Sequence, residues 1–560
     1  MKKLPELLCP CGSEESLKAA VLGGADAVYL GGSAFNARMN AKNFDDEALK
    51  RSVAYCHDRG VKVYVTLNTL VTDRQLPAAL KFVGFLYSVG VDALIVADCG
   101  LTCQIRKYYP GFPIHASTQF SCHSLDGVRW LKDLGFERVV LARELSSGDL
   151  KTVCASKPCE LEVFVHGALC ASHSGQCLMS AFLGGRSGNK GECAQPCRMS
   201  YNGSHPLSLR DLCLAGHLTE LVAMGVDSLK IEGRMKSPQY VYRVSSVYRR
   251  LLDEGRDAGK EDIRELAAVF SRGGFTDGYY RRRLTDMTGV RSEEDKQLSR
   301  RQKDRFEPVG APKKAYSVKR APVDAPEALI LPPKPPKNTC RSARFADPAS
   351  VACRDYFDIV YLPLFSFDPQ KANGVVLPSV ITDSEREEAR KKLIWAAKNG
   401  AVHALVGNPG HLALLDGLGM TLHGDFRLNV QNSFAEPYNG IFEDIVVSPE
   451  LNLAQIRDIR VKKSVIIYGR MPLMLLERRL GIPSLRDRTG ATFPVMREGR
   501  RDLVLNAVPI YMADQKSKLR DAGIFNTHFI FTDETASEAA AVVEAYRRGE
   551  PLGKPVRRIK

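Results

Sequence analysis

Through the N-terminal half, amphipathic helix patterns alternate with short, almost continuous apolar runs, and a glycine marks each junction. Gly24–Leu30 and Gly90–Val96 are two clear copies, Gly60 begins a weaker one, and similar copies start at Gly135 and Gly225. A glycine at a helix C-terminus permits the left-handed turn that ends the helix. An apolar run without alternation is typical of a strand buried on both faces. The pattern therefore predicts repeated βα units with parallel strands.

Eight such strands are expected in the N-terminal half, and eight is the number that closes a TIM barrel. They are predicted near residues 6–9, 27–31, 62–68, 93–97, 114–119, 138–143, 160–166 and 228–232. We expect a TIM-like (β/α)8 barrel over residues 1–285. An open doubly wound sheet is the alternative, but no glycine-rich phosphate-binding fingerprint follows the first strand.

Residues 286–325 interrupt this pattern with Pro, Gly and Ser among basic pairs such as Lys313-Lys314 and Lys319-Arg320. They are either a solvated linker or an arm that contacts phosphates. Buried-strand patterns then resume, which predicts a second α/β domain over residues 326–560, in the form of a degenerate or partial barrel. Its strands are expected at 328–331, 359–362, 404–406, 445–447 and 465–468.

Composition agrees with a globular chain of several domains. The 560 residues exceed what one core needs, and hydrophobic residues make up 44%. No apolar run approaches the length of a membrane span, and no secretion signal is seen, so we expect a cytoplasmic protein with no membrane partner. The formal net charge of +15 suits a polyanionic partner such as RNA, although net charge alone does not show that the protein binds RNA.

Cysteine is the most informative residue type. Thirteen of the fifteen cysteines lie between Cys9 and Cys213, and in a reducing compartment they are not expected to form a disulfide framework. Five cysteines are concentrated just after the strand predicted at 160–166, at positions 170, 177, 193, 197 and 213. Grouped thiolates bind soft metals, either zinc or iron in a cluster. The loose spacing suits a cluster built from several loops. The alternative is that these cysteines bind no metal and are buried as small apolar side chains.

Two long motifs resemble a known family. They are Glu162–Ser180, which contains Gly167-Ala168-Leu169-Cys170 and Cys177-x-Met179-Ser180, and Leu229–Pro238, which reads Leu-Lys-Ile-Glu-Gly-Arg-Met-Lys-Ser-Pro. Both match the signature of the collagenase-like peptidase family, peptidase family U32. The resemblance covers residues 1 to about 285 closely, and parts of the C-terminal half resemble the second domain of longer members.

The resemblance implies a four-cysteine iron–sulfur cluster (4Fe–4S) and oxygen-independent hydroxylation of an RNA base in tRNA or rRNA. By motif position the ligands are Cys170, Cys177 and Cys193, with Cys213 favoured over Cys197 as the fourth. Relatives that modify RNA also imply prephenate as a candidate oxygen donor. Proteolysis, as the family name says, and a metal-stabilised scaffold are the alternatives.

Polar residues at the predicted strand ends supply candidate catalytic groups. His166 and Glu232 can move protons, whereas Arg143, Arg186 and Arg234 can hold carboxylates or phosphates. We therefore expect His166, Glu232, Arg234 and Arg143 to be catalytic. Asn68, Asp98, Gln119 and Glu144 are expected at the same end of the barrel. No serine-hydrolase elbow and no His-Glu-x-x-His motif supports a peptidase, but a Cys170 or Cys177 nucleophile beside a histidine stays open.

Overall fold

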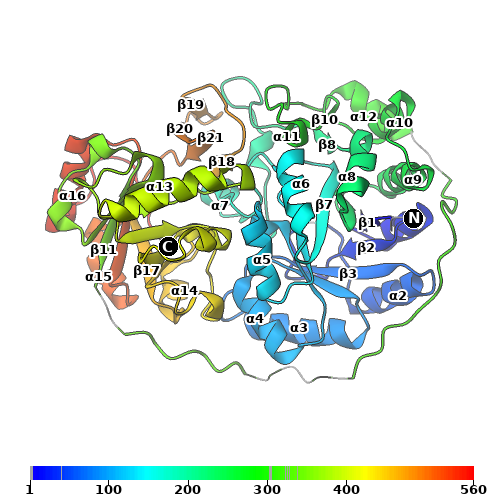
Figure 1. Cartoon of the computed structure of the whole chain (residues 1–560), viewed down its shortest axis with the longest axis horizontal. Coiled ribbons are helices and arrows are strands. Elements are labelled where there is room, and N and C mark those ends of the chain that lie inside the picture. The colour runs from blue at the N-terminus through cyan, green and yellow to red at the C-terminus, as the bar shows by residue number, and fades with distance from the viewer. Residues whose placement is uncertain are drawn as a thin grey trace.

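The computed structural model contains two closed parallel barrels and a small antiparallel sheet (Figure 1). It describes residues 4–38, 41–301, 305–321, 323, 326, 328–336 and 339–559.

The first barrel has the eight predicted parallel strands. These are β1 (Glu6–Pro10), β2 (Ala27–Leu30), β3 (Lys62–Leu67), β4 (Ala93–Val96), β5 (Ile114–Ala116), β6 (Arg138–Val140), β7 (Glu160–Gly167) and β9 (Ser228–Ile231). Pairing of β9 with both β1 and β7 closes the sheet. The TIM-like barrel is confirmed, and the closure excludes an open doubly wound sheet.

The glycine at each junction and the aspartate that follows three of these glycines, at positions 26, 92 and 227, have separate roles in this barrel. Gly90 adopts φ +84° at the junction between helix and strand, where a side chain would be strained. Two residues further on, Asp92 accepts a hydrogen bond from the N–H of Val63 at 2.8 Å. Asp227 accepts one from Leu161 at 2.9 Å in the same way. Each aspartate therefore ties the start of its own strand to the neighbouring strand.

A long excursion between β7 and β9 carries the grouped cysteines. It contains α7 (Met179–Gly184), the short strand β8 (Asp211–Cys213) and α8 (Leu218–Met224). Strand β8 pairs antiparallel with the end of β7. After β9 come α9 (Pro238–Glu254), α10 (Lys260–Val269) and β10 (Phe275–Thr276), which pairs with β8 outside the barrel.

The segment predicted as a basic connector contains a helix, α12 (Glu293–Arg301), and the chain after this helix runs along the outside of the first barrel toward the second (Figure 1). Its residues bind the end of the barrel at which the strands begin. Lys313 pairs with Asp26 at 2.9 Å, the Tyr316 hydroxyl lies 2.9 Å from an Asp92 oxygen, and Arg320 donates to the carbonyl of Val91 at 2.6 Å. These side chains are therefore engaged with the protein itself.

The C-terminal half forms a second closed barrel rather than a partial one. Its parallel strands are β11 (Arg341–Phe345), β12 (Ile359–Pro363), β13 (Gly374–Val376), β14 (His403–Val406), β15 (Thr421–Gly424), β16 (Ile445–Val446), β17 (Lys463–Gly469) and β23 (Asn526–Phe531). Pairing of β17 with β16 and β23, and of β23 with β11, closes it.

The prediction of a strand at 328–331 is wrong. This segment is irregular and Ile330 is 86% exposed. Pro332 and Pro333 follow at once, and proline lacks the N–H that a strand ladder needs. The sequence analysis also missed an antiparallel sheet inserted into the second barrel. Its strands are β18 (Pro472–Leu476), β19 (Ser484–Arg486), β20 (Thr492–Glu498) and β21 (Arg501–Leu505).

The second barrel faces the first with the end at which its strands finish. Asn408, just after β14, donates to the carbonyl of Ser121 at 3.1 Å. Asn432 donates to Asp98 at 2.9 Å, and the Ser433 N–H donates to Asp73 at 2.7 Å. TIM barrels hold their active sites at this end. In the second barrel the first barrel covers it.

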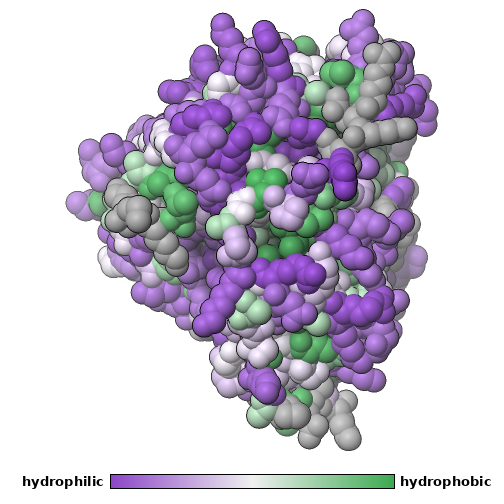
Figure 2. Space-filling view, turned by 90° about the vertical axis from the view of Figure 1, so that its right-hand side faces the viewer, coloured by the Kyte–Doolittle hydropathy of each residue, from purple (hydrophilic) through white to green (hydrophobic). Residues whose placement is uncertain are grey.

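Within the described ranges no helix combines the length and the apolar character needed to cross a bilayer. The face that lies on the right in Figure 1 is mostly hydrophilic, with a few hydrophobic side chains grouped near its middle (Figure 2).

Candidate functional site

A cavity of about 220 Å³ opens at the end of the first barrel where its strands finish. Five residues predicted at strand ends line it: Asn68 after β3, Gln119 after β5, Arg143 after β6, and Glu232 and Arg234 after β9. This is the end at which TIM barrels carry their active sites.

Glu232 lies between two arginines in this cavity. Its carboxylate is 3.2 Å from the guanidinium of Arg38 and 3.5 Å from that of Arg143. Burial alone would raise the pKa of Glu232, but Arg38 and Arg143 outweigh burial and lower it below its usual value. The side chain is therefore an ionised carboxylate, able to accept a proton or a hydrogen bond.

Arg234 is buried next to this pair and is held by neutral partners. It donates to the hydroxyl of Thr66 at 3.1 Å and to the amide oxygens of Asn36 and Asn43 at 2.9 and 2.7 Å. Burial lowers its pKa to about 10, so it stays charged at neutral pH. Arg143 is fixed by a 2.8 Å hydrogen bond to Ser174 and stacks on the ring of Phe164.

Four cysteines line the same cavity: Cys170, Cys177, Cys193 and Cys197. They come from two segments, the loop after β7 and the stretch after α7. Arg198 joins the two segments, because it follows Cys197 and donates to the carbonyl of Leu169 at 2.9 Å. All four are free thiols.

The four thiols influence one another electrostatically. Burial raises the pKa of Cys177, and the neighbouring Cys193, Cys197 and Cys170 raise it further. Burial likewise raises the pKa of Cys197 to about 11, with Cys170 and Cys193 adding to the effect. Four thiolates here would repel one another unless a cation were shared between them.

Cys213, the favoured fourth ligand from sequence, does not line this cavity. In the antiparallel pairing of β8 with β7 it lies opposite His166. Its sulfur is buried, 3.8 Å from the hydroxyl of Tyr248. The structure brings Cys197 to the other three cysteines in its place.

The family model of peptidase family U32 matches residues 12–288. A protein named Collagenase, from Porphyromonas gingivalis, is 33% identical over 307 residues, which cover 49% of this chain and 73% of that protein. This chain belongs to peptidase family U32.

Other relatives in the family have names that refer to RNA. A protein of Escherichia coli named as a 23S rRNA 5-hydroxycytidine synthase is 39% identical over 259 residues, covering 44% of this chain and 39% of that protein. A protein of Bacillus subtilis named as a tRNA hydroxylation protein is 38% identical over 268 residues, covering 45% of this chain and 64% of that protein. The matches thus span less than two thirds of these two relatives' own length.

In this member of peptidase family U32, His166 lies outside the cavity. It packs among the rings of Tyr240, Tyr248 and Phe275, and its Nδ1 is 3.4 Å from the Tyr248 hydroxyl. Burial lowers its pKa to about 3, so it is neutral. Aromatic rings thus enclose His166, which belongs to β7 and does not line the cavity.

Three other candidates also lie elsewhere. Asp98 caps α4 (Cys99–Tyr108), accepting from Leu101 at 2.8 Å. Glu144 lies 3.6 Å from His173. The exposed Arg186 donates to the carbonyl of Glu192 at 3.1 Å.

The sequence analysis missed two cavity residues that the positions of the strands would have indicated. Arg38 follows β2 as the other candidates follow their strands. Lys230 lies within the Leu229–Pro238 motif on β9, and its Nζ is 2.6 Å from Glu162 and 4.5 Å from the centre of the Tyr29 ring. The family's conspicuous motif therefore includes a buried lysine as well as Glu232 and Arg234.

Among the described residues, no group of three or more His, Cys, Asp or Glu side chains is placed to hold a metal ion. Four cysteine thiols at the wall of one cavity are a donor set that either a single zinc ion or an iron–sulfur cluster accepts.

Proposed function

We propose that this chain hydroxylates an RNA base and carries a 4Fe–4S cluster on Cys170, Cys177, Cys193 and Cys197. The observation that carries the proposal is that these four thiols line one cavity together with Glu232 and its arginines. Relatives named for hydroxylation of tRNA and rRNA support the reaction class. The proposal replaces Cys213 with Cys197 as the fourth ligand.

The chain's own groups fit such a cluster. The raised thiol pKa values mean that binding of iron displaces protons from the cysteines, so loading of the site depends on pH. When bound, the cluster supplies redox-active iron at the cavity wall.

The charged residues have a separate role in this proposal, which is to hold a small anionic oxygen donor. Arg234 makes its hydrogen bonds to neutral oxygens and therefore has charge left for a ligand. Arg143 and Arg38 lie on either side of Glu232. A carboxylate donor, for which prephenate is the candidate, would bind these guanidinium groups. Its oxygen would pass to the base carbon, so that the base is oxidised and the donor reduced by two electrons, and Glu232 would take the proton that leaves this carbon and return it to the reduced donor.

The RNA would have to present a single unstacked base, because a cavity of about 220 Å³ does not admit a duplex. Phe164 and Tyr29 line the cavity and offer apolar surface to a base, and Met235 is 52% exposed at its rim. The net charge of +15 favours association with the phosphate backbone. Such an RNA substrate would place the protein in the cytoplasm.

Peptidase activity is the second candidate, favoured by the relative named Collagenase. A cysteine nucleophile needs a histidine with one ring nitrogen turned toward the thiol, while the other nitrogen can pair with a carboxylate. His166 is outside the cavity. His173, which lines it, has Nε2 3.1 Å from Glu477 and Nδ1 3.6 Å from Glu144, so both of its ring nitrogens face carboxylates. The histidines therefore support this candidate less well than the four cysteines support a cluster.

Comparison of RNA nucleosides from a deletion strain and its parent tests the proposal. We expect one hydroxylated nucleoside to disappear from tRNA or rRNA, to return with the wild-type gene, and to stay absent with Cys177→Ala. An unchanged nucleoside profile would contradict the RNA hydroxylase. Cleavage of gelatin by purified protein, together with an unchanged nucleoside profile in the deletion strain, would favour the peptidase.

A further inference from the structure

The segments that carry the cysteines belong to the hydrophobic core of the C-terminal half. Leu178, Met179, Phe182 and Tyr201 are buried in the same cluster as the strands of the second barrel, and the side chains of Cys177 and Cys197 pack against it. The first barrel has its own separate core. The cysteine segments thus leave one barrel and are buried by the other half of the molecule.

The loop between Cys170 and Cys177 is also hydrogen-bonded along β18 of the inserted sheet. The N–H of His173 donates to the carbonyl of Leu475 at 2.9 Å, and the N–H of Leu178 donates to that of Leu473 at 2.8 Å. In return, the N–H of Leu475 donates to the hydroxyl of Ser172 at 3.1 Å. The loop follows the strand at both of its ends.

A buried ion network centres on Glu477, which directly follows β18. One carboxylate oxygen lies 3.1 Å from His173 Nε2 and 2.7 Å from Arg501 Nε, and the other is 2.9 Å from Arg282. The Glu477 side chain is 1% exposed. On its other side His173 is 3.6 Å from Glu144 of the first barrel. The histidine of the cysteine loop is therefore enclosed between carboxylates from both halves.

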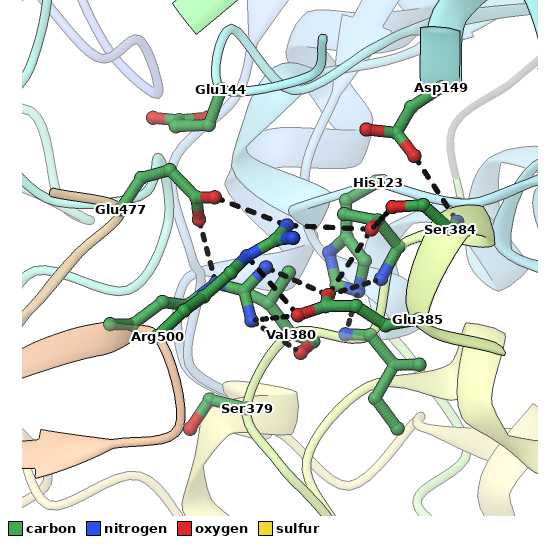
Figure 3. Close-up of polar contacts among 12 residues, drawn as sticks. His123, Glu144, Asp149, Ser379, Val380, Ser384, Glu385, Glu477 and Arg500 are labelled. Atoms are coloured by element: carbon green, nitrogen blue, oxygen red, sulfur yellow. Dashed lines mark hydrogen bonds and ion pairs between the residues drawn. The ribbon is translucent and has the colours of Figure 1, made fainter. Parts of the chain in front are cut away.

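Arginines extend this network to the second barrel. Figure 3 shows Arg500 reaching from the inserted sheet toward both Glu477 and Glu385. Arg501 bridges the same two carboxylates. A buried carboxylate with several cationic partners is costly to disturb, because removing its charge leaves the partners unpaired.

We propose that the C-terminal half fixes the conformation of the cysteine site. In this proposal Glu477 is a positioning residue that holds the Cys170–Cys177 loop in the conformation that binds the cluster. This inference rests on the proposed cluster, but its structural part can be measured without metal.

The first experiment compares full-length, metal-free wild type with Glu477→Gln by hydrogen exchange. Glutamine keeps the size of the side chain and removes its charge, so His173 loses the nearer of its two carboxylate neighbours and keeps Glu144. We expect the amides of His173 and Leu178 to exchange about tenfold faster or more, the change expected for the loss of a hydrogen bond to a charged group. Glu534→Gln is the matched control, since Glu534 accepts from Tyr468 at 2.8 Å within the C-terminal half. The control should leave both amides unchanged.

The second experiment measures loss of iron from cluster-loaded protein after addition of a chelator, followed by visible absorbance. Glu477→Gln should lose the cluster about tenfold faster than wild type, as expected when a charged hydrogen bond is removed, and Glu534→Gln should match wild type. The double variant His173→Gln/Glu477→Gln should lose the cluster about as fast as Glu477→Gln alone, because the contact between the two side chains is already lost in that single variant.

Ser172→Ala provides a milder test if Glu477→Gln does not fold, because it removes a single hydrogen bond to Leu475. It should speed exchange at Leu475 and loss of iron in the same direction. Unchanged loop exchange in the folded variants would overturn the positioning role. A wild-type protein that never binds iron would overturn the proposed cluster instead, and the exchange result would still decide whether Glu477 holds the loop.

Discussion

At the residue scale, the cavity places one carboxylate among several cations. Among the described residues that line it, Glu232 is the one acidic side chain, and Arg38, Arg143 and Arg234 surround it. The arginines keep Glu232 ionised, and Glu232 keeps the arginines from repelling one another. This balance suits a site that receives a small anion and takes up one proton.

Glu232→Gln should therefore lower RNA hydroxylation by about 100-fold or more, the lower range for loss of a general base. Iron content should stay at the wild-type level, because Glu232 is not a proposed ligand. Product nucleoside per enzyme, measured by mass spectrometry, is the test. The exposed Glu192→Gln serves as control and should keep full activity. Full activity in Glu232→Gln would remove this residue from the mechanism.

His166 should affect stability rather than catalysis. Burial lowers its pKa to about 3, whereas in the unfolded chain the value is about 6.5. Between these values the unfolded state binds a proton that the folded state does not, so the free energy of unfolding falls as pH falls below 6.5. The free energy of unfolding of wild type should fall between pH 7 and pH 5.5, and in His166→Gln this fall should be smaller by about 1 kcal/mol. Urea unfolding of both proteins at the two pH values measures this, and parallel losses would contradict the buried neutral histidine.

Sequence reasoning could indicate that the cysteines belong together but not which four meet. Cys197 and Cys213 both follow Cys193 at plausible distances. The choice depends on the antiparallel pairing of β8 with β7, which places Cys213 opposite His166, and neither of these residues lines the cavity. A strand of only three residues leaves too little pattern in the sequence to reveal that geometry.

At the element scale, the eight strands of the first barrel could be predicted because a glycine shortly precedes most of them, with an aspartate following the glycine in three. The inserted sheet β18–β21 could not be predicted from the sequence. Its strands are separated by charged turns such as Glu498-Gly499-Arg500, and β20 is only half-buried, so periodicity is weak. The sheet also packs against the cysteine loop, which is distant in sequence, and no local sequence pattern predicts that contact.

The connector gives a prediction at this scale. Arg320 and Lys313 bind backbone carbonyls and Asp26 on the first barrel. Arg320→Met should therefore lower the free energy of unfolding by about 1–2 kcal/mol, as for a partly buried charged hydrogen bond, and leave RNA affinity unchanged. Lys319→Met, an exposed neighbour, is the control and should change stability little. A shallower salt dependence of RNA binding in Arg320→Met would instead support a phosphate-contacting arm.

At the scale of the whole molecule, the two barrels are not equivalent. The first keeps an open cavity where its strands end, while the second is covered at that end and supplies the core against which the cysteine segments pack. The second barrel thereby contributes to the site without displaying an open strand end of its own.

A chain truncated after residue 325 should not hold the cluster. Without the second half, Leu178, Met179, Phe182 and Tyr201 lose the core that buries them. Exposing several large apolar side chains costs about 1.5–3 kcal/mol each. Iron content and thermal unfolding of the truncated and full-length chains are the measurements. A truncated chain with full iron content would show that the first barrel builds the site alone.

Iron and sulfide analysis, with a visible spectrum, of protein purified without oxygen decides whether these four cysteines hold a cluster. Wild type, Cys197→Ala and Cys213→Ala are compared. We expect about four irons per chain in wild type and in Cys213→Ala, and loss of iron and colour in Cys197→Ala. A colourless wild-type protein, or iron that survives in Cys197→Ala and is lost in Cys213→Ala, would contradict this expectation.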